Sequence, residues 1–485
     1  RRRLGREWGL LAALMFVSTP AVLRLATSAY VDLGLTFFFT AAVSALFLWA
    51  EKGRTGFLVL SAAAFGLALG TKYSALVGLP LLGAGVVLAA VRKGAGPGRA
   101  LLEGALFAAV ALLVFSPWAV WNWLETGNPV YPLANSFFGL PPLDAPGHGL
   151  GVFGVRRLYY GESLWKVLLT PVRAFFVGRD YSGQYFDGVL NPFLLLLPPL
   201  AFIRLREATP GQVRLGEATP GQVRLGEATP GQVRLREATP GQVRLREATP
   251  GQVRFRDSTP GQVRPSFPET GPLAALAGLW ILLVFFKQHF IIRYVAPVLP
   301  FLVIVSVYGL YRIAHGFRRR AALALAGALI LMALGYNAWY AYDHWRRLDP
   351  VSYLSGREDR EAFLGRRLGY YPTASYVRGH TPPDAKVLLL FVGGQSYYFD
   401  RVCYFNLTQP GRPLLEVLEK SGTVAEVAGQ VRKFGVTYLA VREEAMWKYI
   451  KDFLPDKTGL WRGFLEDRTR KLFTARGYSV YVLGP

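Results

Sequence analysis

Three ionisable residues stand at the ends of long apolar runs, where a charge is costly and usually has a function. Asp32 lies in SAYVDLGLTFFF, Lys72 in GTKYSALVGLP and Arg293 in KQHFIIRYVAPVLP. An acid and two cations at one membrane surface suit an anionic, phosphate-bearing lipid, because lysine and arginine bind phosphate oxygens. The carboxylate could hold a divalent metal or orient an acceptor. The alternative is an interfacial charge at a helix end, which costs little, and the residues alone favour neither.

Other chemistries find little support in the sequence. Cys403 is the only cysteine, so it can form no intrachain disulfide. Gly393-Gly394 follows a strand-like run, but two glycines favour a plain turn over a phosphate loop. Residues 128–132 (NPVYP) could be a binding element or only a rigid turn, and we favour the turn. The five histidines lack the spacing of metal ligands: His148, His289, His315, His344 and His380.

Nine apolar runs must position these candidates. Of the 485 residues, 52% are apolar and 18% are charged, which is below the roughly 25% charged residues of soluble domains. The runs are roughly 16–21 residues long, with two shorter, and so match a hydrocarbon core about 30 Å thick. Because lipid cannot satisfy backbone polar groups, each run should be a helix. The sequence predicts a mainly α, polytopic membrane protein with runs at 8–23, 32–50, 57–70, 75–91, 101–121, 189–203, 272–287, 294–311 and 321–341.

Lysine and arginine set the orientation of these helices, because they collect in short cytoplasmic loops. The basic clusters all fall on one side if the nine helices alternate, and they carry most of the net charge of +23. The charge therefore indicates topology and not nucleic-acid binding. We expect a multi-pass protein of the cell inner (plasma) membrane, with its C-terminal domain extracytoplasmic and the three candidates at the outer surface. The clusters are residues 1–6, 52–54, 92–99, 204–264 and 318–320.

The organisation of the chain follows from these runs. Residues 1–203 are the first transmembrane part, with an outer loop at 122–187 in which 162–177 should form an interfacial helix. Residues 204–268 hold a ten-residue tandem repeat, EATPGQVRLx, whose unit is too short and polar to build a core. We interpret it as a disordered cytoplasmic loop of duplicated origin; the alternative is an arginine-rich segment attracted to anionic headgroups. Residues 269–341 are the second transmembrane part.

Residues 342–485 change in pattern. Short apolar runs at 386–392, 437–441 and 478–483 are typical of buried strands. Residues 412–434 and 443–453 have helical periodicity. The alternation predicts a small extracytoplasmic α/β domain with a largely parallel sheet.

Five stretches of the sequence carry a family resemblance. Residues 8–20 run into AYVDLGLTFFFT, and GLALGTKYSALVGLPLL, SPWAVWNWLETGNPVYPLANSFFG, RYVAPVLPFLVIV and TPPDAKVLLLFVGGQSYYFDR follow. In order and spacing they resemble the GT-C membrane glycosyltransferases, specifically the bacterial relatives of protein O-mannosyltransferases in glycosyltransferase family 39. The resemblance covers most of the chain apart from the repeat. It implies a hexosyltransferase that moves a sugar, with inversion, from a dolichyl- or undecaprenyl-phosphate carrier to a protein, lipid or glycan acceptor at the outer face.

The resemblance also implies roles for particular residues. Asp32 matches a catalytic acid near a metal or acceptor, so a divalent metal is a possible cofactor. Lys72 with Tyr73, and Arg293 with Tyr294, match positions that bind the donor phosphate. The family's first outer loop carries further catalytic acids. This chain begins with arginine, so we expect it to be N-terminally truncated and to lack that loop.

The expected chemistry is direct displacement, in which a base activates an acceptor hydroxyl or amine. Lys72, Arg293 or a metal would stabilise the leaving phosphate. Two alternatives stand beside the transferase. A transporter of lipid-linked substrates should show polar groups at mid-membrane and internal pseudo-repeats, and a non-catalytic scaffold would bind a partner through the outer domain. The gathering of charges at one surface favours the transferase.

Overall fold

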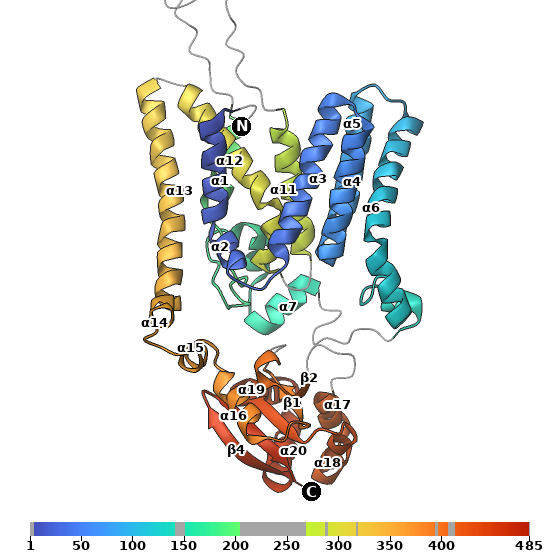
Figure 1. The fold of residues 1–485 in the computed structure, drawn as a ribbon, viewed down its shortest axis with the longest axis vertical. Coiled ribbons are helices and arrows are strands. Elements are labelled where there is room, and N and C mark those ends of the chain that lie inside the picture. The colour runs from blue at the N-terminus through green and yellow to red at the C-terminus, as the bar shows by residue number, and fades with distance from the viewer. Residues whose placement is uncertain are drawn as a thin grey trace, which may run out of the picture.

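The computed structural model describes residues 4–140, 151–203, 268–286, 290–316, 319–392, 396–405 and 413–484. A helical part and a smaller α/β domain follow one another along the longest axis (Figure 1). This arrangement confirms the predicted mainly α fold with a C-terminal α/β domain. Residues 204–267 of the repeat lie outside the described residues, as do Gly393-Gly394, His148 and His289.

Five described helices are long and apolar enough to cross a bilayer, or six if the bent pair α1 and α2 counts as one span. The pair is bent by 65° where Pro20 begins α2, because proline removes an amide hydrogen from the helical ladder. Two further helices, α4 and α11, are shorter and apolar. The elements are α1 (Arg6–Ser18), α2 (Pro20–Ala26), α3 (Asp32–Lys52), α4 (Thr55–Thr71), η1 (Tyr73–Val77), α5 (Gly78–Arg92), α6 (Pro97–Thr126), α11 (Thr270–Phe285), η4 (Ile292–Val298), α12 (Leu299–Gly316) and α13 (Arg319–Leu348).

The sixth predicted membrane helix, residues 189–203, is not a continuous helix. The segment contains only α10 (Phe193–Leu196) and the short 3-10 helix η3 (Pro198–Ala201). The apolar run predicted a helix, but three residues lack the amide hydrogen that a helix needs: Pro192, Pro198 and Pro199.

This broken segment nevertheless runs along α12. The Ile292 amide of η4, the element that leads into α12, donates to the Phe186 carbonyl (2.8 Å) just before the segment begins. Arg312 donates to the Ala201 carbonyl (2.5 Å) near its other end. Irregular backbone is tolerated at membrane depth when protein buries it, and α12 supplies that cover.

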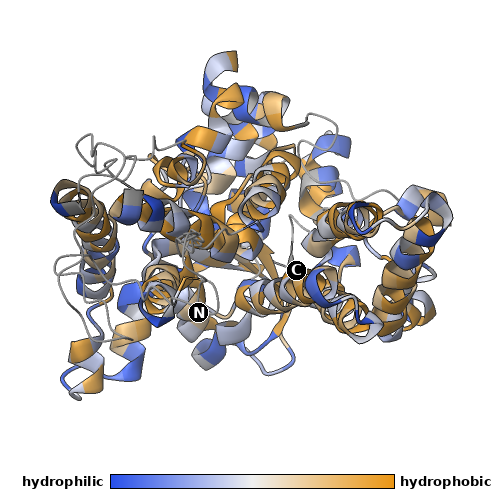
Figure 2. Ribbon diagram, turned by 90° about the horizontal axis from the view of Figure 1, so that it is seen from above, coloured by the Kyte–Doolittle hydropathy of each residue, from blue (hydrophilic) through white to orange (hydrophobic). Residues whose placement is uncertain are grey.

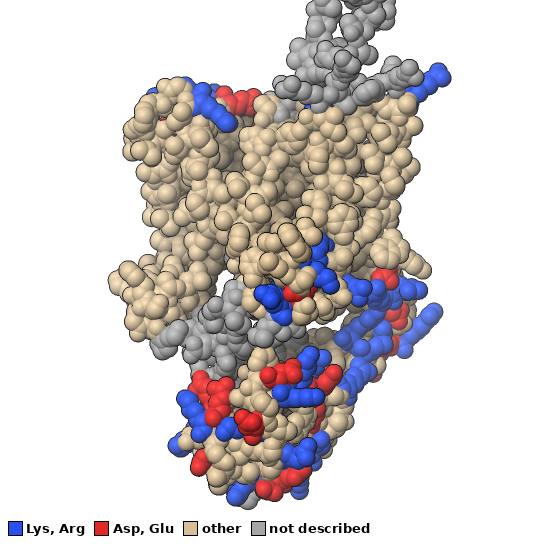
Figure 3. Space-filling view, turned by 180° about the vertical axis from the view of Figure 1, so that it is seen from behind, with Lys and Arg blue, Asp and Glu red and all other residues tan. Residues whose placement is uncertain are grey.

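The helices form two groups. α3, α4, α5 and α6 pack together on one side, and α1, α12 and α13 on the other, with α11 between them (Figure 1). Seen from above, the helices are coloured mainly as apolar (Figure 2). From behind, a broad uncharged band separates two charged ends (Figure 3). Leucines such as Leu113, 70% exposed, lie on the outside of the helices, as expected for a surface in contact with lipid.

The two ends of the helical part are named here for later use. The basic end carries Lys52, Arg54, Arg92 and Lys93. The domain end faces the α/β domain (Figure 1). The start of α1 lies at the basic end, so the start of the chain and the α/β domain are at opposite ends of the helices.

The loop at the domain end contains more helix than the sequence predicted. Its elements are η2 (Asn135–Phe138), α7 (Gly151–Tyr160), α8 (Leu164–Leu168) and α9 (Thr170–Arg173). The single interfacial helix predicted at 162–177 is therefore two short helices, separated at Leu169 with Pro171 at the start of the second. Val167 is buried against the membrane part while Trp165 is exposed, which is the two-sided pattern of an interfacial segment.

The α/β domain has a five-stranded sheet in the order β2-β1-β3-β5-β4. Its strands are β1 (Lys386–Leu390), β2 (Val402–Phe405), β3 (Tyr438–Arg442), β4 (Thr469–Ala475) and β5 (Tyr478–Leu483). Its helices are α14 (Pro350–Leu354), α15 (Arg360–Arg367), α16 (Tyr371–His380), α17 (Pro413–Lys420), α18 (Val424–Lys433), α19 (Glu443–Phe453) and α20 (Thr458–Arg468), with the short 3-10 turns η5 (Tyr397–Phe399) and η6 (Pro455–Lys457).

The three predicted strands are present, but the sheet is mixed and not largely parallel. β1 pairs in parallel with β2 and β3, with Leu388 opposite Leu439. β5 pairs antiparallel with β3 and β4. The β4–β5 hairpin turns at Arg476 and Gly477, both at positive φ, the geometry of tight hairpin turns. Alternate residues face the two cores: Leu388 lies in one and Leu389 in the other.

Candidate functional site

Asp32 and Lys72 form a direct ion pair at the domain end. Asp32 is the first residue of α3, and Lys72 follows the last residue of α4. The Lys72 Nζ donates to Asp32 Oδ1 at 2.6 Å. The Asp32 side chain is 2% exposed and that of Lys72 is 22% exposed. The first turn of a helix favours a negative charge, so both α3 and Lys72 stabilise the carboxylate.

The second carboxylate oxygen of Asp32 is the unusual feature of this pair. Asp32 Oδ2 is buried and has no hydrogen-bond partner among the described residues. A buried polar atom without a partner costs free energy, and such an atom in a native structure calls for an explanation. It is therefore available to accept a hydrogen bond or to bind a cation.

Of the two predicted tyrosines, Tyr294 contacts Lys72 directly, and Tyr73 follows Lys72 in the chain and contacts α6. The Lys72 ammonium lies 5.0 Å from the centre of the Tyr294 ring, which is within cation–π range. The Tyr73 hydroxyl accepts hydrogen bonds from Asn122 Nδ2 (2.7 Å) and Trp118 Nε1 (3.0 Å). Residues of α3 and η4 thus contact the Lys72 ammonium, and the neighbouring Tyr73 of η1 joins the site to α6.

Arg293 belongs to the same neighbourhood, although no hydrogen bond to Asp32 or Lys72 is found among the described contacts. Its guanidinium carbon lies 4.8 Å from the Tyr30 ring centre and 5.6 Å from that of Tyr294. Lys72 and Arg293 therefore face one aromatic ring. Arg293 Nε is buried and has no hydrogen-bond partner among the described residues, so this cation also keeps donor capacity.

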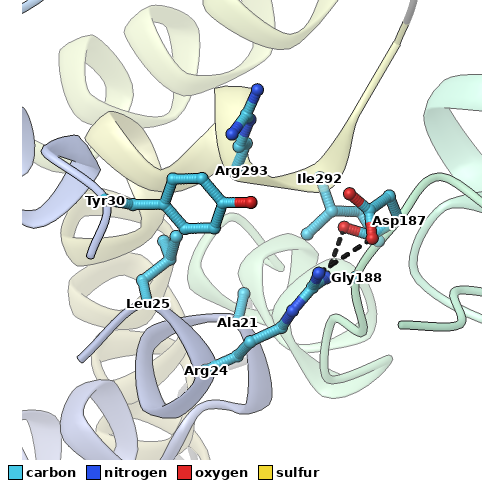
Figure 4. Close-up of a pocket in the computed structure, with 8 residues that line it drawn as sticks. All are labelled: Ala21, Arg24, Leu25, Tyr30, Asp187, Gly188, Ile292 and Arg293. Atoms are coloured by element: carbon cyan, nitrogen blue, oxygen red, sulfur yellow. Dashed lines mark hydrogen bonds and ion pairs between the residues drawn. The ribbon is translucent and has the colours of Figure 1, made fainter. Parts of the chain in front are cut away.

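A narrow pocket extends from Arg293 to a second charged group (Figure 4). Arg24 and Arg293 lie on opposite sides of it, and Tyr30, Asp187 and Gly188 complete the lining. The pocket thus joins the predicted site to residues that sequence reasoning missed.

The missed residues form a network around Arg24. Its guanidinium donates to Asp180 Oδ1 (3.1 Å), Asp187 Oδ1 (2.8 Å) and the Asp187 carbonyl (2.7 Å). The Tyr340 hydroxyl of α13 donates to Asp180 Oδ2 (2.7 Å). The Arg24 side chain is 9% exposed. The rule that singled out Asp32, a charge next to an apolar run, applies equally to Arg24 and would have found it.

This network holds a loop with an unusual backbone. Tyr181, Phe186 and Asp187 have φ values of +61°, +67° and +40°, which bulky residues rarely adopt. Asp187 Oδ1 also accepts from the Tyr181 amide (2.8 Å). Strained backbone persists only where its surroundings fix it. Here Arg24 and η4 fix it beside the pocket.

A buried ion cluster anchors α7 to the rest of the loop. Glu162 accepts from Arg156 Nε (2.6 Å) and Nη2 (2.9 Å) and from Arg173 Nη2 (3.1 Å). Burial alone would raise the pKa of the Glu162 carboxyl, but the hydrogen bonds and charges of the two arginines outweigh it and hold that pKa below its ordinary value. None of the described contacts of this cluster involves Lys72.

The NPVYP segment is a rigid turn. Asn128 is fully buried, and its Nδ2 donates to the Leu133 carbonyl (2.7 Å) and to Asn135 Oδ1 (3.0 Å). Its Oδ1 accepts from the Val130 amide (2.9 Å). The Tyr131–Pro132 peptide bond is cis. These contacts satisfy the Asn128 side chain within the turn, as expected if residues 128–132 form a rigid turn.

The described residues contain no group of three histidine, cysteine, aspartate or glutamate side chains that converges as metal ligands do. Asp32 offers one carboxylate oxygen, Oδ2. A divalent cation bound there would need further oxygen ligands, such as those of a bound phosphate.

Comparison with known proteins gives a family match for part of the chain. Residues 1–121 match the family described as dolichyl-phosphate-mannose-protein mannosyltransferase. No curated protein matches the chain. The matched segment includes both Asp32 and Lys72.

Two solved structures show similarity over nearly the whole chain. One is the archaeal oligosaccharyltransferase AglB from Archaeoglobus fulgidus, in complex with an inhibitory peptide and a dolichol-phosphate, with a TM-score of 0.48 and 13% identity. The match covers 94% of this chain and 58% of that one, so this chain spans under two thirds of its length. The other is ArnT from Cupriavidus metallidurans bound to undecaprenyl phosphate, with a TM-score of 0.47, 16% identity and coverage of 100% and 81%.

The family match extends over about a quarter of the chain. Over residues 1–121, it confirms the resemblance to the polyprenyl-phosphate-dependent membrane glycosyltransferases that the sequence motifs indicated.

Proposed function

We propose that this protein is an integral-membrane glycosyltransferase that moves a sugar from a polyprenyl-phosphate carrier to an acceptor at the outer face of the membrane. The observation that carries the proposal is the Asp32–Lys72 pair, buried at the domain end within the segment that matches the family. The family description names a dolichyl-phosphate sugar as donor. A lipid phosphate at the membrane surface is the ligand that these charges suit.

Lys72 is the proposed principal phosphate contact. An ammonium group has three donor hydrogens, and Asp32 uses one of them. The remaining donors can bind phosphate oxygens while Asp32 and the Tyr294 ring hold the group in place. Arg293 would supply a second cation, and the Tyr73 hydroxyl, which accepts from two neighbours, can donate its own proton.

The reaction we propose is a single displacement with inversion. The acceptor oxygen or nitrogen forms a bond to the anomeric carbon while the bond from that carbon to the phosphate oxygen breaks. The phosphate leaves with the electron pair, and a base takes the acceptor proton. Negative charge grows on the leaving phosphate, and preorganised cations in a site of low dielectric stabilise that charge in the transition state. Asp32 Oδ2 would orient the acceptor or bind a cation.

Donor turnover tests the proposal without knowledge of the acceptor. Membranes containing the full-length protein would be supplied with polyprenyl-phosphate mannose, and release of polyprenyl phosphate would be measured. We expect Asp32→Asn and Lys72→Gln to lower the rate by about 100-fold or more, the usual cost of losing one transition-state contact. Arg54→Gln, an exposed cation at the basic end, is the matched control. Wild-type rates in both site variants would contradict the assignment.

A further inference from the structure

A second candidate binding site lies at the basic end, far along the helices from Lys72. An apolar groove of about 630 Å³ runs between α5 and α11 and is also lined by α3. Its walls are mainly hydrocarbon, and small residues on both sides create its width. Representative lining residues are Leu46, Phe47, Leu82, Gly85, Ala275 and Leu276.

The groove has the length of one lipid leaflet. Along α5 its lining runs from Leu81 to Arg92, which at 1.5 Å per residue is about 16 Å. The hydrocarbon core of a bilayer is about 30 Å thick, so one leaflet contributes about half of that. The groove therefore extends from near the middle of the membrane to the headgroup level at the basic end.

The apolar walls determine what can fill this groove. Apolar cavities do not hold ordered water, because water needs polar partners. At membrane depth the available occupant is a lipid acyl chain. Dispersion attraction between such a chain and the walls is that of ordinary hydrocarbon packing, which does not by itself select one lipid over another.

Two cations at the end of the groove favour a lipid with a negatively charged headgroup. Arg92 and Lys93 both line it. Lys93 is held in place, because its Nζ donates to the Trp49 carbonyl (2.6 Å) and lies 4.0 Å from the Trp49 ring centre. Two of its three donor hydrogens remain for a ligand. The nearby acid Glu103 has its own partner in Arg99, at 3.5 Å.

We propose that this groove binds an anionic phospholipid, with one acyl chain along α5 and α11 and its phosphate on Arg92 and Lys93. Because cations collect on the cytoplasmic side of membrane proteins, the lipid belongs to the cytoplasmic leaflet. Basic pockets between membrane helices on that side suit acidic headgroups. This site is separate from the proposed donor site and lies in the opposite leaflet.

Lipid retention by the full chain tests this inference. The purified protein would be titrated with phosphatidylglycerol or phosphatidylcholine in mixed micelles, and bound lipid would be counted by native mass spectrometry. We expect phosphatidylglycerol to be retained preferentially. The double variant Arg92→Gln/Lys93→Gln should weaken its binding about thirtyfold, about fivefold for each cation near the surface.

Two further variants separate the groove from general charge. Arg6→Gln/Arg54→Gln removes the same charge from exposed positions at the basic end outside the groove and should leave binding within about twofold. Ala275→Phe fills the groove without altering its charge and should abolish retention of phosphatidylglycerol. Equal retention of the two phospholipids by the wild type would overturn the proposal. Unchanged retention in Arg92→Gln/Lys93→Gln or in Ala275→Phe would also overturn it.

Discussion

The Lys72 ammonium lies 2.6 Å from the Asp32 carboxylate and joins the ends of α3 and α4 at the domain end. Asp32 is buried but incompletely satisfied, since its Oδ2 has no partner among the described residues. Neutralising a buried pair with well-packed residues is often tolerated, whereas removing one partner alone is costly. An arrangement that leaves one oxygen open is therefore better suited to binding than to stability.

A double-mutant cycle should show this coupling in the stability of the protein. We expect Lys72→Met alone to lower the free energy of unfolding by about 3 kcal/mol, because it leaves the Asp32 charge buried and unpaired. Asp32→Asn/Lys72→Met should cost less than that single change. Unfolding in mixed micelles measures the losses in Asp32→Asn, in Lys72→Met and in the double variant. Strictly additive losses would show that the two groups are not coupled.

The Arg24 network should control the loop beside the pocket. Arg24→Met removes the shared partner of Asp180 and Asp187, so two partly buried carboxylates lose their counter-charge. We expect amide hydrogen exchange at Tyr181, Asp187 and Gly188 to rise by about 100-fold, as local opening of the strained loop becomes easier. Arg157→Gln, an exposed cation on α7, is the control. Equal protection in Arg24→Met and the wild type would argue against this role.

The Glu162 cluster should make the loop sensitive to acid. The pKa of Glu162 is lowered in the folded protein because the hydrogen bonds and charges of Arg156 and Arg173 outweigh the opposing effect of burial. A lowered folded pKa gives stability that is present above the unfolded value, about 4.3, and is lost as pH falls through the folded value. The stability difference between the wild type and Glu162→Gln should therefore be constant from pH 8 to about 5. It should shrink below that range in denaturant titrations. A difference that persists at low pH would contradict the prediction.

Cysteine labelling in intact cells should test the predicted orientation. Cys403 is a poor reporter, because burial raises the pKa of its thiol to about 11 and keeps it protonated at neutral pH. In a Cys403→Ser background, Lys420→Cys on α17 should react with a membrane-impermeant maleimide from outside. Arg54→Cys should react only after the membrane is permeabilised. The reverse pattern would place the α/β domain inside and refute the outer-face assignment.

Much of the helical part could be predicted from the sequence, because a bilayer leaves few alternatives to an apolar helix. Eight of the nine predicted runs contain helix over most of their length. The remaining run, residues 189–203, is apolar, but its three prolines prevent a continuous helix. The sheet was predicted only in part. β2 and β4 are the edge strands. β4 carries the exposed residues Arg470 and Lys471 and so lacks the continuous apolar pattern of a buried strand. β2 is apolar but only four residues long, which is too short to stand out as a run.

The candidate site divides in the same way. Asp32 and Lys72 were found separately from their positions at the ends of apolar runs, but their contact joins residues 40 positions apart. The contacts of Arg24 with Asp180 and Asp187 span 156 and 163 positions. Spacing along one chain does not encode contacts of that range. The side-chain types were visible in the sequence, and the partners required the fold.

Binding of a polyprenyl phosphate to the purified full chain tests the central claim most directly. The dissociation constant would be measured for the wild type, Lys72→Gln and Arg54→Gln at one salt concentration. We predict that Lys72→Gln weakens binding about tenfold or more, since a hydrogen bond to a charged group contributes about 1.5–3 kcal/mol. Arg54→Gln should bind like the wild type. Equal affinity in Lys72→Gln and the wild type would contradict the assignment of Lys72 as the phosphate contact.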